Sequence, residues 1–342
     1  MEIREELRQS LLKKYRLKQD PLDGFYASAE VKEAVLAVMI SGRHLLLEGP
    51  PGTGKTTLSK ILASQLGQMQ IVEGCRYNCD PEYPMCPDCL AKRNGPGTVT
   101  IQGRSRFIRI QGSPELMPED LLGDIDPVIA MQCGIHDQRA FTPGRIQRAH
   151  RKILFIDELN RIPERTQNTL IQVLEEGTTT LSGFDIDVPV DTVVVATENP
   201  QELAGVDRIS ETLGDRFERI HIGYPVPEQE VAILKRYARK YEGIKFDDEL
   251  LSKVVEISQI TRASDEISRP ASVRASIATF EQAQAIAQLK CRDSVNMHDI
   301  EEAAMISLQG RVEVSMSSRH YNDQQALLRQ VIEGNLQTGY IG

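Results

Sequence analysis

The sequence predicts an α/β fold with a parallel sheet, followed by a domain made of helices. Three observations lead to this prediction. A glycine-rich loop, residues 49–56, separates a short apolar run from a segment with helical spacing. A second apolar run, residues 153–156, ends in two acidic residues, as expected for a strand buried on both faces of a parallel sheet. From residue 228 onward, the apolar residues recur at helical spacing.

The loop between the first predicted strand and helix carries a phosphate-binding motif. Its sequence, Gly49-Pro50-Pro51-Gly52-Thr53-Gly54-Lys55-Thr56, fits G-x-x-x-x-G-K-[ST] at every position. Residues 45–47 predict a buried strand before it, and residues 57–66, beginning with Thr57, predict a helix after it. Backbone N–H groups of such a loop point at phosphate oxygens, and the amino end of the helix adds partial positive charge.

Two side chains of the motif have distinct expected roles. Lys55 reaches the β and γ phosphates, and the Thr56 hydroxyl is a ligand for Mg²⁺. The alternative is a chance glycine-rich turn, which the flanking strand and helix disfavour. The sequence therefore predicts that the chain binds a nucleoside triphosphate.

The composition is that of a soluble globular protein with one large domain or two smaller ones. The 342 residues are 40% hydrophobic and 26% charged. The net charge of −9 argues against a general nucleic-acid binder, because such proteins carry a basic excess, although a local basic pore stays open. No apolar run reaches membrane-spanning length, and residues 1–18 lack a signal-peptide core. We therefore expect a cytoplasmic protein, with an amphipathic helix in residues 1–20.

Four of the six cysteines lie within fifteen residues of an insert, residues 73–95. They are Cys75, Cys79, Cys86 and Cys89. Thiolates at this spacing can converge on one tetrahedral ion. Because the insert is too short and too polar to bury a core, a metal would hold it together. Zinc is the first hypothesis, with an iron–sulfur cluster below it, and unliganded thiols are the remaining alternative. Cys133 and Cys291 stand alone and are interpreted as packing residues.

The second strong motif follows a long interval. Residues 106–110 predict a strand, and residues 112–152 are too many for one crossover helix, which favours an inserted loop or helix. The next strand ends in Asp157 and Glu158, at the edge where a parallel sheet binds its ligand. Asp157 would hold Mg²⁺, directly or through water, and Glu158 would orient and polarise the attacking water. A solvated strand end is the alternative.

A further polar residue is predicted at the same edge of the sheet. Residues 163–176 predict a helix, and residues 178–192 predict a hairpin that turns at Ser182-Gly183. The buried strand at residues 193–197 is followed by Asn199. The Asn199 amide can hydrogen-bond the γ phosphate or the attacking water. Taken alone, Asn199-Pro200 would be interpreted as a turn.

Arg216 precedes the last predicted strand, residues 219–223, and the Pro-Val-Pro of residues 225–227 marks the exit from the α/β domain, residues 21–226. An arginine offered across a subunit interface can stabilise the charge that develops in phosphoryl transfer. A surface salt bridge is an equally weighted alternative.

Residues 227–310 predict a small helical domain packed at the nucleotide crevice. Its helices are expected at residues 231–241, 247–260, 273–289 and 297–308. Arg274, early in the third helix, is placed to reach back to the phosphates. Residues 311–342 form a C-terminal tail, in which residues 323–333 predict a last helix.

With these pieces in order, residues 20–310 resemble the AAA+ ATPases, and more narrowly the branch of the MoxR-type ATPases and the magnesium-chelatase ATPase subunit. The motifs that carry the resemblance are the segment from Ser41 through the phosphate loop, Gly112-Ser113-Pro114-Glu115-Leu116, Phe141-Thr142-Pro143-Gly144, residues 153–161, Thr197-Glu198-Asn199-Pro200 and Asp215-Arg216-Phe217. The resemblance implies a three-layer sandwich around a parallel five-stranded sheet, followed by an all-helical lid. It implies ATP and Mg²⁺ as cofactors.

The resemblance also implies roles for single residues. These are Lys55 and Thr56 in Walker A, Asp157 and Glu158 in Walker B, Asn199 as sensor 1, Arg216 as the trans arginine finger and Arg274 as sensor 2. The lead into Arg274, Arg269-Pro270-Ala271-Ser272-Val273, departs from the glycine-containing pattern of the family. Residues 112–143 are similar to the helix-two insert of the branch, and residues 178–192 to the hairpin before sensor 1. In the rings of this family, such elements face a central pore or a client. The cysteine insert lies outside the core pattern of MoxR ATPases.

Three functions are compatible with this resemblance. The first is an ATP-hydrolysing homo-oligomeric ring, expected to be a hexamer, that remodels or activates a separate partner protein. MoxR-type proteins often serve a partner with a von Willebrand A domain, and this chain has no Asp-x-Ser-x-Ser signature of its own. The alternative is the ATPase motor subunit of a magnesium or cobalt chelatase. A DNA-stimulated motor comes third, because the acidic balance speaks against nucleic acid.

Overall fold

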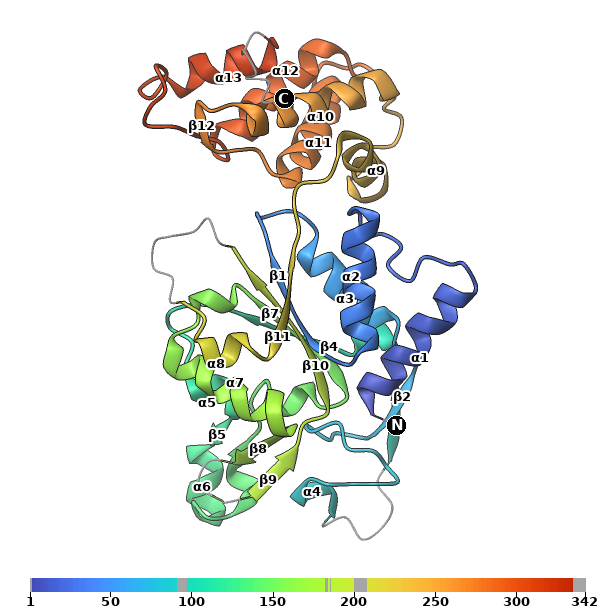
Figure 1. Cartoon of the computed structure of the whole chain (residues 1–342), viewed down its shortest axis with the longest axis vertical. Coiled ribbons are helices and arrows are strands. Elements are labelled where there is room, and N and C mark those ends of the chain that lie inside the picture. Colours follow the sequence, from blue (N-terminus) through green and yellow to red (C-terminus); the bar gives the residue numbers. More distant parts are fainter. Residues whose placement is uncertain (1, 91–96, 182–183, 185, 200–207, 335–342) are drawn as a thin grey trace. The chain divides into compact units, whose positions relative to one another are not determined.

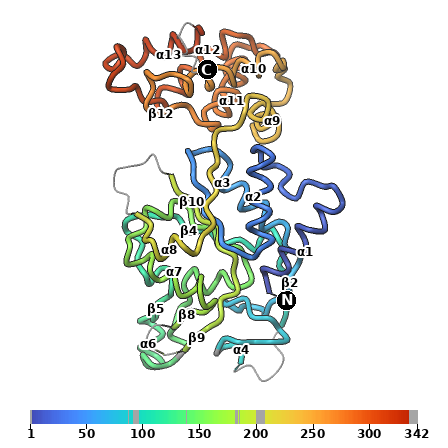
Figure 2. The backbone as a smooth tube through the Cα atoms, viewed as in Figure 1, coloured from blue at the N-terminus to red at the C-terminus, as the bar shows by residue number. Residues whose placement is uncertain are grey.

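The computed structural model describes residues 2–90, 97–181, 184, 186–199 and 208–334 (Figure 2). The chain divides into two compact units. Unit 1 comprises Met1–Gly49 and Gly54–Ile222, and unit 2 comprises Pro50–Thr53 and Gly223–Gly342. Each unit has a hydrophobic core of its own. In the described part of the chain, no helix combines the length and apolar character that a membrane span requires.

Unit 1 is built on a sheet of five parallel strands in the order β11-β1-β10-β7-β4 (Figure 1). The strands are β1 (His44–Glu48), β4 (Phe107–Gln111), β7 (Lys152–Asp157), β10 (Thr192–Glu198) and β11 (Phe217–His221). Strands β1, β7 and β10 are buried along most of their length, which is why their sequences are continuous apolar runs. The predicted five-stranded parallel sheet is confirmed. Its last strand lies two residues earlier than predicted, because the buried Phe217 ring already packs into the core.

Helices cover both faces of this sheet. One face carries α1 (Ile3–Arg16), α2 (Ala29–Ile40) and α3 (Lys55–Ser64), and the other carries α5 (Pro118–Leu122), α7 (Glu164–Glu176) and α8 (Glu211–Gly214) (Figure 1). Successive residues of one strand serve the two layers: Leu45 and Leu47 pack with α1–α3, and Leu46 packs with the opposite layer. The predicted three-layer sandwich is therefore confirmed.

The N-terminal helix α1 is part of the core of unit 1. Its buried stripe, Ile3, Leu7 and Leu11, recurs every fourth residue, as an amphipathic helix requires. On the same helix, the Glu6 carboxylate accepts two hydrogen bonds from the buried Arg106, from Nη1 at 2.6 Å and from Nη2 at 2.8 Å. This bidentate pair ties α1 to the segment that leads into β4.

Along the chain, several small elements are inserted between the strands of the main sheet. The cysteine insert joins two short antiparallel strands that the sequence did not reveal, β2 (Met69–Val72) and β3 (Thr98–Ile101), and contains α4 (Pro87–Leu90). The long interval before β7 contains β5 (Asp124–Ile125), α6 (Pro127–Cys133) and β6 (Phe141–Thr142). The predicted hairpin is β8 (Thr178–Leu181) with β9 (Ile186–Pro189), and its predicted turn at Ser182-Gly183 lies outside the described residues. Unit 1 also contains the 3₁₀ helices η1 (Gly103–Ser105), η2 (Gln138–Ala140), η3 (Gln147–Ala149) and η4 (Leu159–Arg161).

Unit 2 is mainly helical. Its helices are α9 (Pro227–Tyr237), α10 (Asp248–Ala263), α11 (Val273–Leu289), α12 (Met297–Gln309) and α13 (Gln324–Ile332), with a short pair of strands, β12 (Ile267–Arg269) and β13 (Glu313–Val314). All five helices contribute to one core, and α13 adds Leu327, Leu328 and Val331 to it. Cys291 is exposed in a left-handed turn after α11, with φ of +55°, so its interpretation as a packing residue is wrong.

Candidate active site

The glycine-rich loop joins the carboxyl end of β1 to the amino end of α3. Gly49 has φ of +147°, and a Cβ there would lie 2.1 Å from the Ile222 carbonyl oxygen, so only glycine fits the position. Gly54 caps α3 with φ of +87°. The helix then begins at Lys55, two residues earlier than predicted, because the loop itself supplies its first turn. The amine of Lys55 donates to the Gly49 carbonyl at 2.6 Å and therefore lies inside the loop.

This loop fits the triphosphate that the sequence predicts. The predicted nucleotide-binding residues of the motif are Gly49, Pro50, Pro51, Gly52, Thr53, Gly54, Lys55, Thr56 and Thr57. They form the loop and the first turn of α3, where the amino-terminal end of the helix dipole favours an anion. The Thr56 and Thr57 side chains are half-buried.

The two predicted acidic residues lie at the carboxyl end of β7 and are fixed by a neighbouring hydroxyl. Asp157 is the last residue of β7, and Glu158 follows in a left-handed conformation with φ of +56°. The Thr197 hydroxyl on β10 donates to Asp157 Oδ1 at 2.8 Å and accepts from the Glu158 backbone N–H at 2.9 Å. One side chain thus holds both residues in register. Thr197 is part of a family motif, but its role emerges only from the pairing of β10 with β7.

Each carboxylate also has a partner on β4. Arg109 donates to Asp157 Oδ2 at 2.5 Å, and Gln111 donates to Glu158 Oε2 at 3.1 Å. Arg161 lies 3.1 Å from the same Glu158 oxygen. The Arg109 and Arg161 side chains are 49% and 40% exposed, so these contacts can be exchanged for a ligand at little cost. Sequence reasoning missed Arg109 and Gln111, although their place at the end of a predicted neighbouring strand was an available signal.

Asn199 lies at the same edge of the sheet. It follows β10, which runs between β1 and β7, and its carbonyl accepts from Asn160 Nδ2 at 3.5 Å. Thus the phosphate loop, the two acidic residues and Asn199 all follow the carboxyl ends of adjacent parallel strands, where such sheets bind their ligands. Pro200, the next residue of the motif, lies outside the described residues.

A second pair of carboxylates supports the strand ends beneath the loop. Glu48 and Glu198 lie opposite each other on β1 and β10. Arg219 on β11 is 2.9 Å from Glu48 and 3.9 Å from Glu198, which compensates the two like charges. Burial raises the pKa of the Glu198 carboxyl, and the nearby Arg219 opposes that rise.

Arg216 lies at the opposite end of the sheet from the phosphate loop. It immediately precedes β11, whose first residue pairs with His44, the first residue of β1. Its side chain is 28% exposed and forms an ion pair with Glu175. It lines a surface cleft of about 390 Å³ together with Arg4, Arg43 and His44 from the N-terminal region of unit 1. Its charged lining consists of three arginines, Arg4, Arg43 and Arg216, and two carboxylates, Glu175 and Asp215.

Burial governs the charge of the imidazole in this cleft. His44 is almost fully buried, and desolvation, reinforced by the adjacent Arg4, lowers its pKa to about 3. Its Nδ1 accepts from the Val194 backbone N–H at 3.0 Å, and its Nε2 lies 3.1 Å from Arg4 Nη2. At neutral pH the ring is uncharged and links α1, β1 and β10.

Arg274 belongs to unit 2, in the first turn of α11. Within that unit, a Cβ built on Gly52 would lie 3.5 Å from Arg274 Cγ and 3.1 Å from the Cβ of Ser272. The assignment of Arg274 as sensor 2 stays a prediction.

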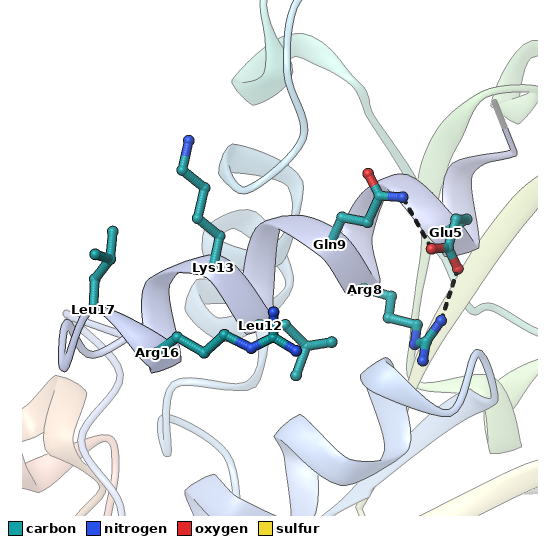
Figure 3. A pocket seen from close by; sticks show the side chains of 7 residues that line it. All are labelled: Glu5, Arg8, Gln9, Leu12, Lys13, Arg16 and Leu17. Carbon is teal, nitrogen blue, oxygen red and sulfur yellow. Dashed lines mark hydrogen bonds and ion pairs between the residues drawn. The ribbon is translucent and has the colours of Figure 1, made fainter.

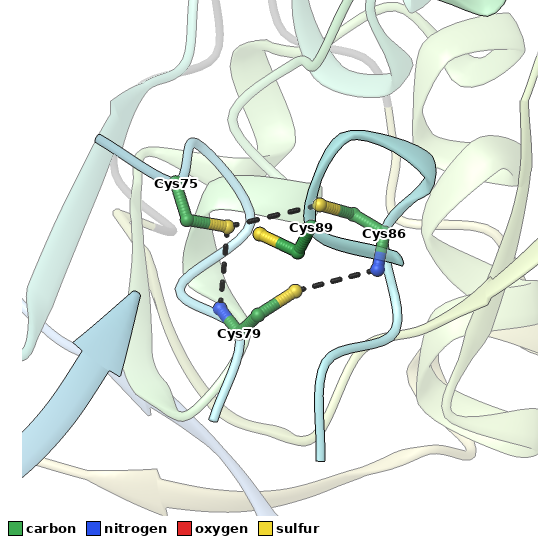
Figure 4. A group of neighbouring side chains, drawn as sticks. All are labelled: Cys75, Cys79, Cys86 and Cys89. Carbon is green, nitrogen blue, oxygen red and sulfur yellow. Dashed lines mark hydrogen bonds between the residues drawn. The ribbon is translucent and has the colours of Figure 1, made fainter. Parts of the chain in front are cut away.

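The four predicted metal-binding cysteines come together in unit 1. Their sulfur atoms all lie within 4.8 Å of one another, and Figure 4 shows them turned toward a common centre. The Cys75 and Cys86 sulfurs are 3.8 Å apart. Three of the four residues are buried, so the cluster is closed to solvent on most sides. Soft thiolate donors in this number are a fitting set for a metal ion.

A further hollow, of about 490 Å³, lies along the solvent-facing side of α1 and is shown in Figure 3. Its lining comes from residues 5–17 alone, and its polar contacts are those of Glu5 with Arg8 and Gln9 on the same helix. A hollow lined by one helix encloses no ligand site.

Comparison with known families divides the chain into three matching segments. Residues 89–219 match the profile of the ATPase family associated with various cellular activities (AAA), and residues 259–331 match an AAA lid domain. Residues 25–78 match the magnesium chelatase subunit ChlI. Together these matches extend over most of the chain, and they include both the phosphate loop and the acidic strand.

Individual relatives agree with these families. The chain is 27% identical over 320 residues to the uncharacterized protein YeaC of Bacillus subtilis, covering 87% of this chain and 86% of the relative. It is 28% identical over 318 residues to the magnesium-chelatase subunit ChlI homolog of Methanocaldococcus jannaschii, covering 85% of each. Chaperone MoxR1 of Mycobacterium tuberculosis is 28% identical over 214 residues, which are 60% of this chain and 43% of MoxR1.

A solved structure shows the same fold. It is a chain from the complex between subunits BchI and BchD of magnesium chelatase, with a TM-score of 0.50 and 21% sequence identity. The match covers 93% of this chain and 99% of that chain. The order of the parallel strands and the helical C-terminal region are therefore those of an established fold.

Proposed function

Because this chain belongs to the AAA+ ATPases, in the branch of the MoxR proteins and the magnesium-chelatase ATPase subunits, we propose that it forms a homo-oligomeric ring that hydrolyses ATP between neighbouring protomers. Six protomers are the expected number. The ring acts on a separate partner protein, and a partner with a von Willebrand A domain is the first candidate. The observation that carries the proposal is the separation, within unit 1, of Arg216 from the two ends of the phosphate loop, Gly49 and Lys55.

This separation follows from the pairing of β1 with β11. His44 pairs with Phe217 and Glu48 pairs with His221, so Arg216 precedes one end of the pair and the loop follows the other. Four residue steps along a parallel strand span about 13 Å, at ~3.3 Å per residue. A guanidinium beyond one end cannot reach phosphates beyond the other. If Arg216 takes part in phosphoryl transfer, it therefore contacts a nucleotide that is bound by an adjacent protomer.

The residues at the carboxyl edge of the sheet divide the work of hydrolysis. Bound Mg²⁺ would neutralise charge on the phosphate oxygens, with Thr56 and Asp157 as the residues that hold it. The loop N–H groups and Lys55 bind the phosphates. Glu158 orients the attacking water and accepts its proton, after it exchanges its contacts with Gln111 and Arg161 for that water. Thr197 keeps the Asp157 carboxylate and the Glu158 backbone in place during this exchange.

Hydrolysis is converted into movement through the residues that contact the γ phosphate. Asn199 after β10, Arg216 from the neighbouring protomer and Arg274 from unit 2 lose this contact when the phosphate leaves. Such a loss releases elements that were held by the nucleotide. The elements that would transmit the movement to a client are the β8–β9 hairpin and the insert that contains α6.

Binding of the nucleotide is tested by Lys55→Ala, with Lys60→Ala as the matched control. Lys60 is exposed on the same helix, so its loss leaves the loop intact. We expect Lys55→Ala to abolish ATP binding in titration calorimetry, because the main cationic partner of the phosphates is removed. Wild-type affinity of Lys55→Ala would contradict the assignment of the loop.

The partner is identified with the Glu158→Gln variant, which is expected to bind ATP without hydrolysing it. Tagged Glu158→Gln protein is purified from its native host in the presence of ATP, and copurifying chains are identified by mass spectrometry. A von Willebrand A-domain protein that is absent when Lys55→Ala is the bait would support the first candidate. Recovery of the same chains with both baits would contradict an ATP-dependent client.

The family match of residues 25–78 favours a second candidate, the ATPase motor subunit of a magnesium or cobalt chelatase. In that case the partners are two further subunits, and the reaction inserts the ion into a tetrapyrrole. Steady-state ATPase rates measured with and without porphyrin, in the presence of those subunits, separate the two candidates. Stimulation by porphyrin supports the chelatase, and its absence supports the protein-remodelling ring.

The four cysteines form a second metal site in this proposal, with Zn²⁺ as the ion. Four thiolates without a carboxylate or histidine are the donor set of a structural zinc site, which leaves no open position for chemistry. The cytoplasmic location expected from the sequence stays a prediction.

A further inference from the structure

We propose that one Zn²⁺ ion, bound by Cys75, Cys79, Cys86 and Cys89, braces the β8–β9 hairpin and the strand β6 at the base of the insert. The zinc site is structural, and nucleotide binding does not depend on it. That the braced elements act on a client rests on the proposed function, whereas the metal and the brace do not.

The spacing of the sulfur atoms selects a single ion. Four thiolates at ~2.3 Å from a central zinc are about 3.8 Å apart at tetrahedral angles. Cys75 and Cys86 are separated by that distance, 3.8 Å, and all four sulfurs lie within 4.8 Å of one another (Figure 4). A cluster of four irons binds each thiolate at a different iron and therefore holds its cysteines farther apart. A disulfide bond, at about 2.05 Å, is much shorter than the observed separation.

The backbone around the sulfurs is arranged to receive negative charge. The Cys79 N–H donates to the Cys75 sulfur at 3.4 Å. The N–H groups of Met85 and Cys86 donate to the Cys79 sulfur at 3.4 and 3.3 Å. Hydrogen bonds to the charged form stabilise thiolates, and four thiolates around Zn²⁺ leave a net charge of −2 to be balanced. The turn that allows these bonds passes through Asn78, whose φ is +54°.

The cysteine-bearing segment, residues 72–90, packs against elements that are distant in sequence. Cys79, Cys86 and Cys89 share a buried cluster with Phe141 of β6 and Val188 of β9. Phe184 and Ile186 of the hairpin pack against the same cluster. The rings of Phe141 and Phe184 meet edge to face, with centroids 6.1 Å apart. β6 and the hairpin therefore pack directly against the metal-binding residues. Figure 1 shows α4, α6, β8 and β9 at the same end of unit 1.

Polar contacts hold the same segment to the central sheet. Asn78 Nδ2 donates to the Arg148 carbonyl at 2.8 Å, just before β7. Arg76 donates to the Phe141 carbonyl at 3.3 Å. Arg151 donates to the Gln70 carbonyl of β2 at 3.0 Å and lies 3.2 Å from Asp80. The segment therefore connects the residues that lead into β7 with β6 and the hairpin.

The hairpin depends on this support because it contains two strands only. Strands β8 and β9 form a separate two-stranded sheet, and an isolated hairpin of that size is marginally stable in water. Thr179 and Val188 of the hairpin are buried, and Gln172 of α7 donates to the Thr180 hydroxyl at 3.2 Å. Val188 is the one of these two buried residues that packs in the cluster of the cysteine-bearing segment. That segment has no core of its own beyond the cluster it shares. Release of the metal would therefore destabilise the cysteine-bearing segment and the hairpin together.

The first test is the metal content of the full chain. Elemental analysis of protein purified without added metal is expected to give about one zinc per chain, and mercurial release into a zinc-sensitive chelator should give the same number. Cys79→Ser should lose the zinc, and Cys291→Ser, which changes an exposed cysteine in unit 2, should retain it. Iron with visible absorption, or protein that binds no added Zn²⁺, would overturn the single-zinc site, as would full zinc retention in Cys79→Ser.

The second test asks what the metal supports, by amide hydrogen exchange of wild-type protein before and after zinc removal. We expect exchange at the amides of residues 186–188 and of Met69–Val72 to become at least about tenfold faster, with exchange in α3 and β7 unchanged. Added Zn²⁺ should restore protection, which keeps the test valid if Cys79→Ser does not fold. Titration calorimetry should show the same ATP affinity in both forms. Unchanged exchange in β9, or loss of ATP binding on zinc removal, would overturn the brace.

These outcomes are independent of the proposed ring. A failure of Lys55→Ala to lose ATP binding would contradict the proposed function and leave the zinc measurements unaffected. Absence of zinc would overturn the inference and leave ATP hydrolysis at the protomer boundary standing.

Discussion

The two ends of the central sheet differ in how their charged groups are held. At the carboxyl end, Asp157 and Glu158 are paired with side chains that are 40–49% exposed. At the amino end, Arg106 is 2% exposed in its pair with Glu6, and His44 is 4% exposed. The carboxyl end therefore exchanges partners readily, whereas the amino end is held by buried contacts that are costly to break.

The difference gives the two ends different tasks. Groups at the carboxyl end must release one another when a nucleotide binds, and their exposed ion pairs allow this. Arg216 lies beside the rigid amino end, next to His44 and Arg4. A rigid support is what an arginine requires if it is to be presented in a fixed position to a neighbouring protomer.

The largest expected effect is on turnover at the carboxyl end. Glu158→Gln should lower kcat by about 10²–10⁴-fold, the contribution of a general base, and leave the ATP affinity unchanged. Glu164→Gln, at an exposed position in the first turn of α7, is the matched control and should keep wild-type turnover. ATPase assays with calorimetry measure both quantities. Wild-type kcat in Glu158→Gln would exclude it as the group that activates water.

The next effect tests the buried ion pair at the amino end. Arg106→Met should lower the free energy of unfolding by about 1.5–3 kcal/mol, because the half-buried Glu6 carboxylate loses its cationic partner and keeps only the Gly67 backbone N–H. Arg106 also donates to the Arg151 carbonyl at 3.0 Å, which is lost as well. Urea denaturation measures the change. The double variant Glu6→Met/Arg106→Met should recover part of the loss, and a loss below about 1 kcal/mol in the single variant would contradict a rigid amino end.

Acid should destabilise the amino end through His44. Its pKa is about 3 in the folded state against an ordinary value near 6.5, so the unfolded chain binds more protons between these values. Stability from this group is complete above about pH 6.5 and declines as the pH falls toward 3, by about 2 kcal/mol at pH 5. Burial also lowers the pKa of His150, to about 4, with the same sign.

The His44 contribution is isolated by comparing wild type with His44→Gln. Urea denaturation of both proteins from pH 7 to pH 5 should show a smaller decline in the variant, since the His150 contribution is common to both. Equal pH dependence of the two proteins would mean that His44 is not held neutral by the fold.

The smallest effect is expected for the exposed pair at the carboxyl end. Arg109→Met should change the free energy of unfolding by less than about 1 kcal/mol, because the guanidinium is 49% exposed. Arg106→Met is the matched comparison at the other end. Removal of Arg109 should also free Asp157, so the Mg²⁺ concentration needed for half-maximal turnover should fall. A loss of stability as large as that of Arg106→Met would remove the distinction between the two ends.

The sequence could predict the parts of the site that are local in the chain. The phosphate loop and the pair Asp157-Glu158 each lie within a few residues, next to recognisable strands, and the family resemblance that these motifs help to carry implied the five-stranded sheet. Arg109, Gln111 and Thr197 join the site only through the register of β4, β7 and β10, which no local pattern encodes. Strands β2 and β3 escaped prediction because four-residue strands separated by the cysteine insert give little periodic signal.

The cysteine site shows the same limit. The spacing of the four cysteines predicted their convergence, which the structure places within 4.8 Å. Their packing against Phe141 and Val188 could not be predicted, because those residues are far away in sequence and are brought together by the fold.

The central claim is that an active site is completed by Arg216 of a neighbouring protomer, and mixing two inactive variants tests it most directly. Arg216→Ala keeps its own phosphate loop, and Lys55→Ala keeps its arginine. Random mixing at equal amounts should place an intact loop beside an intact arginine at about one quarter of the boundaries of a ring. The ATPase rate of the mixture should therefore rise to about a quarter of the wild-type rate per protomer. A mixture that is no more active than its two components would contradict the claim.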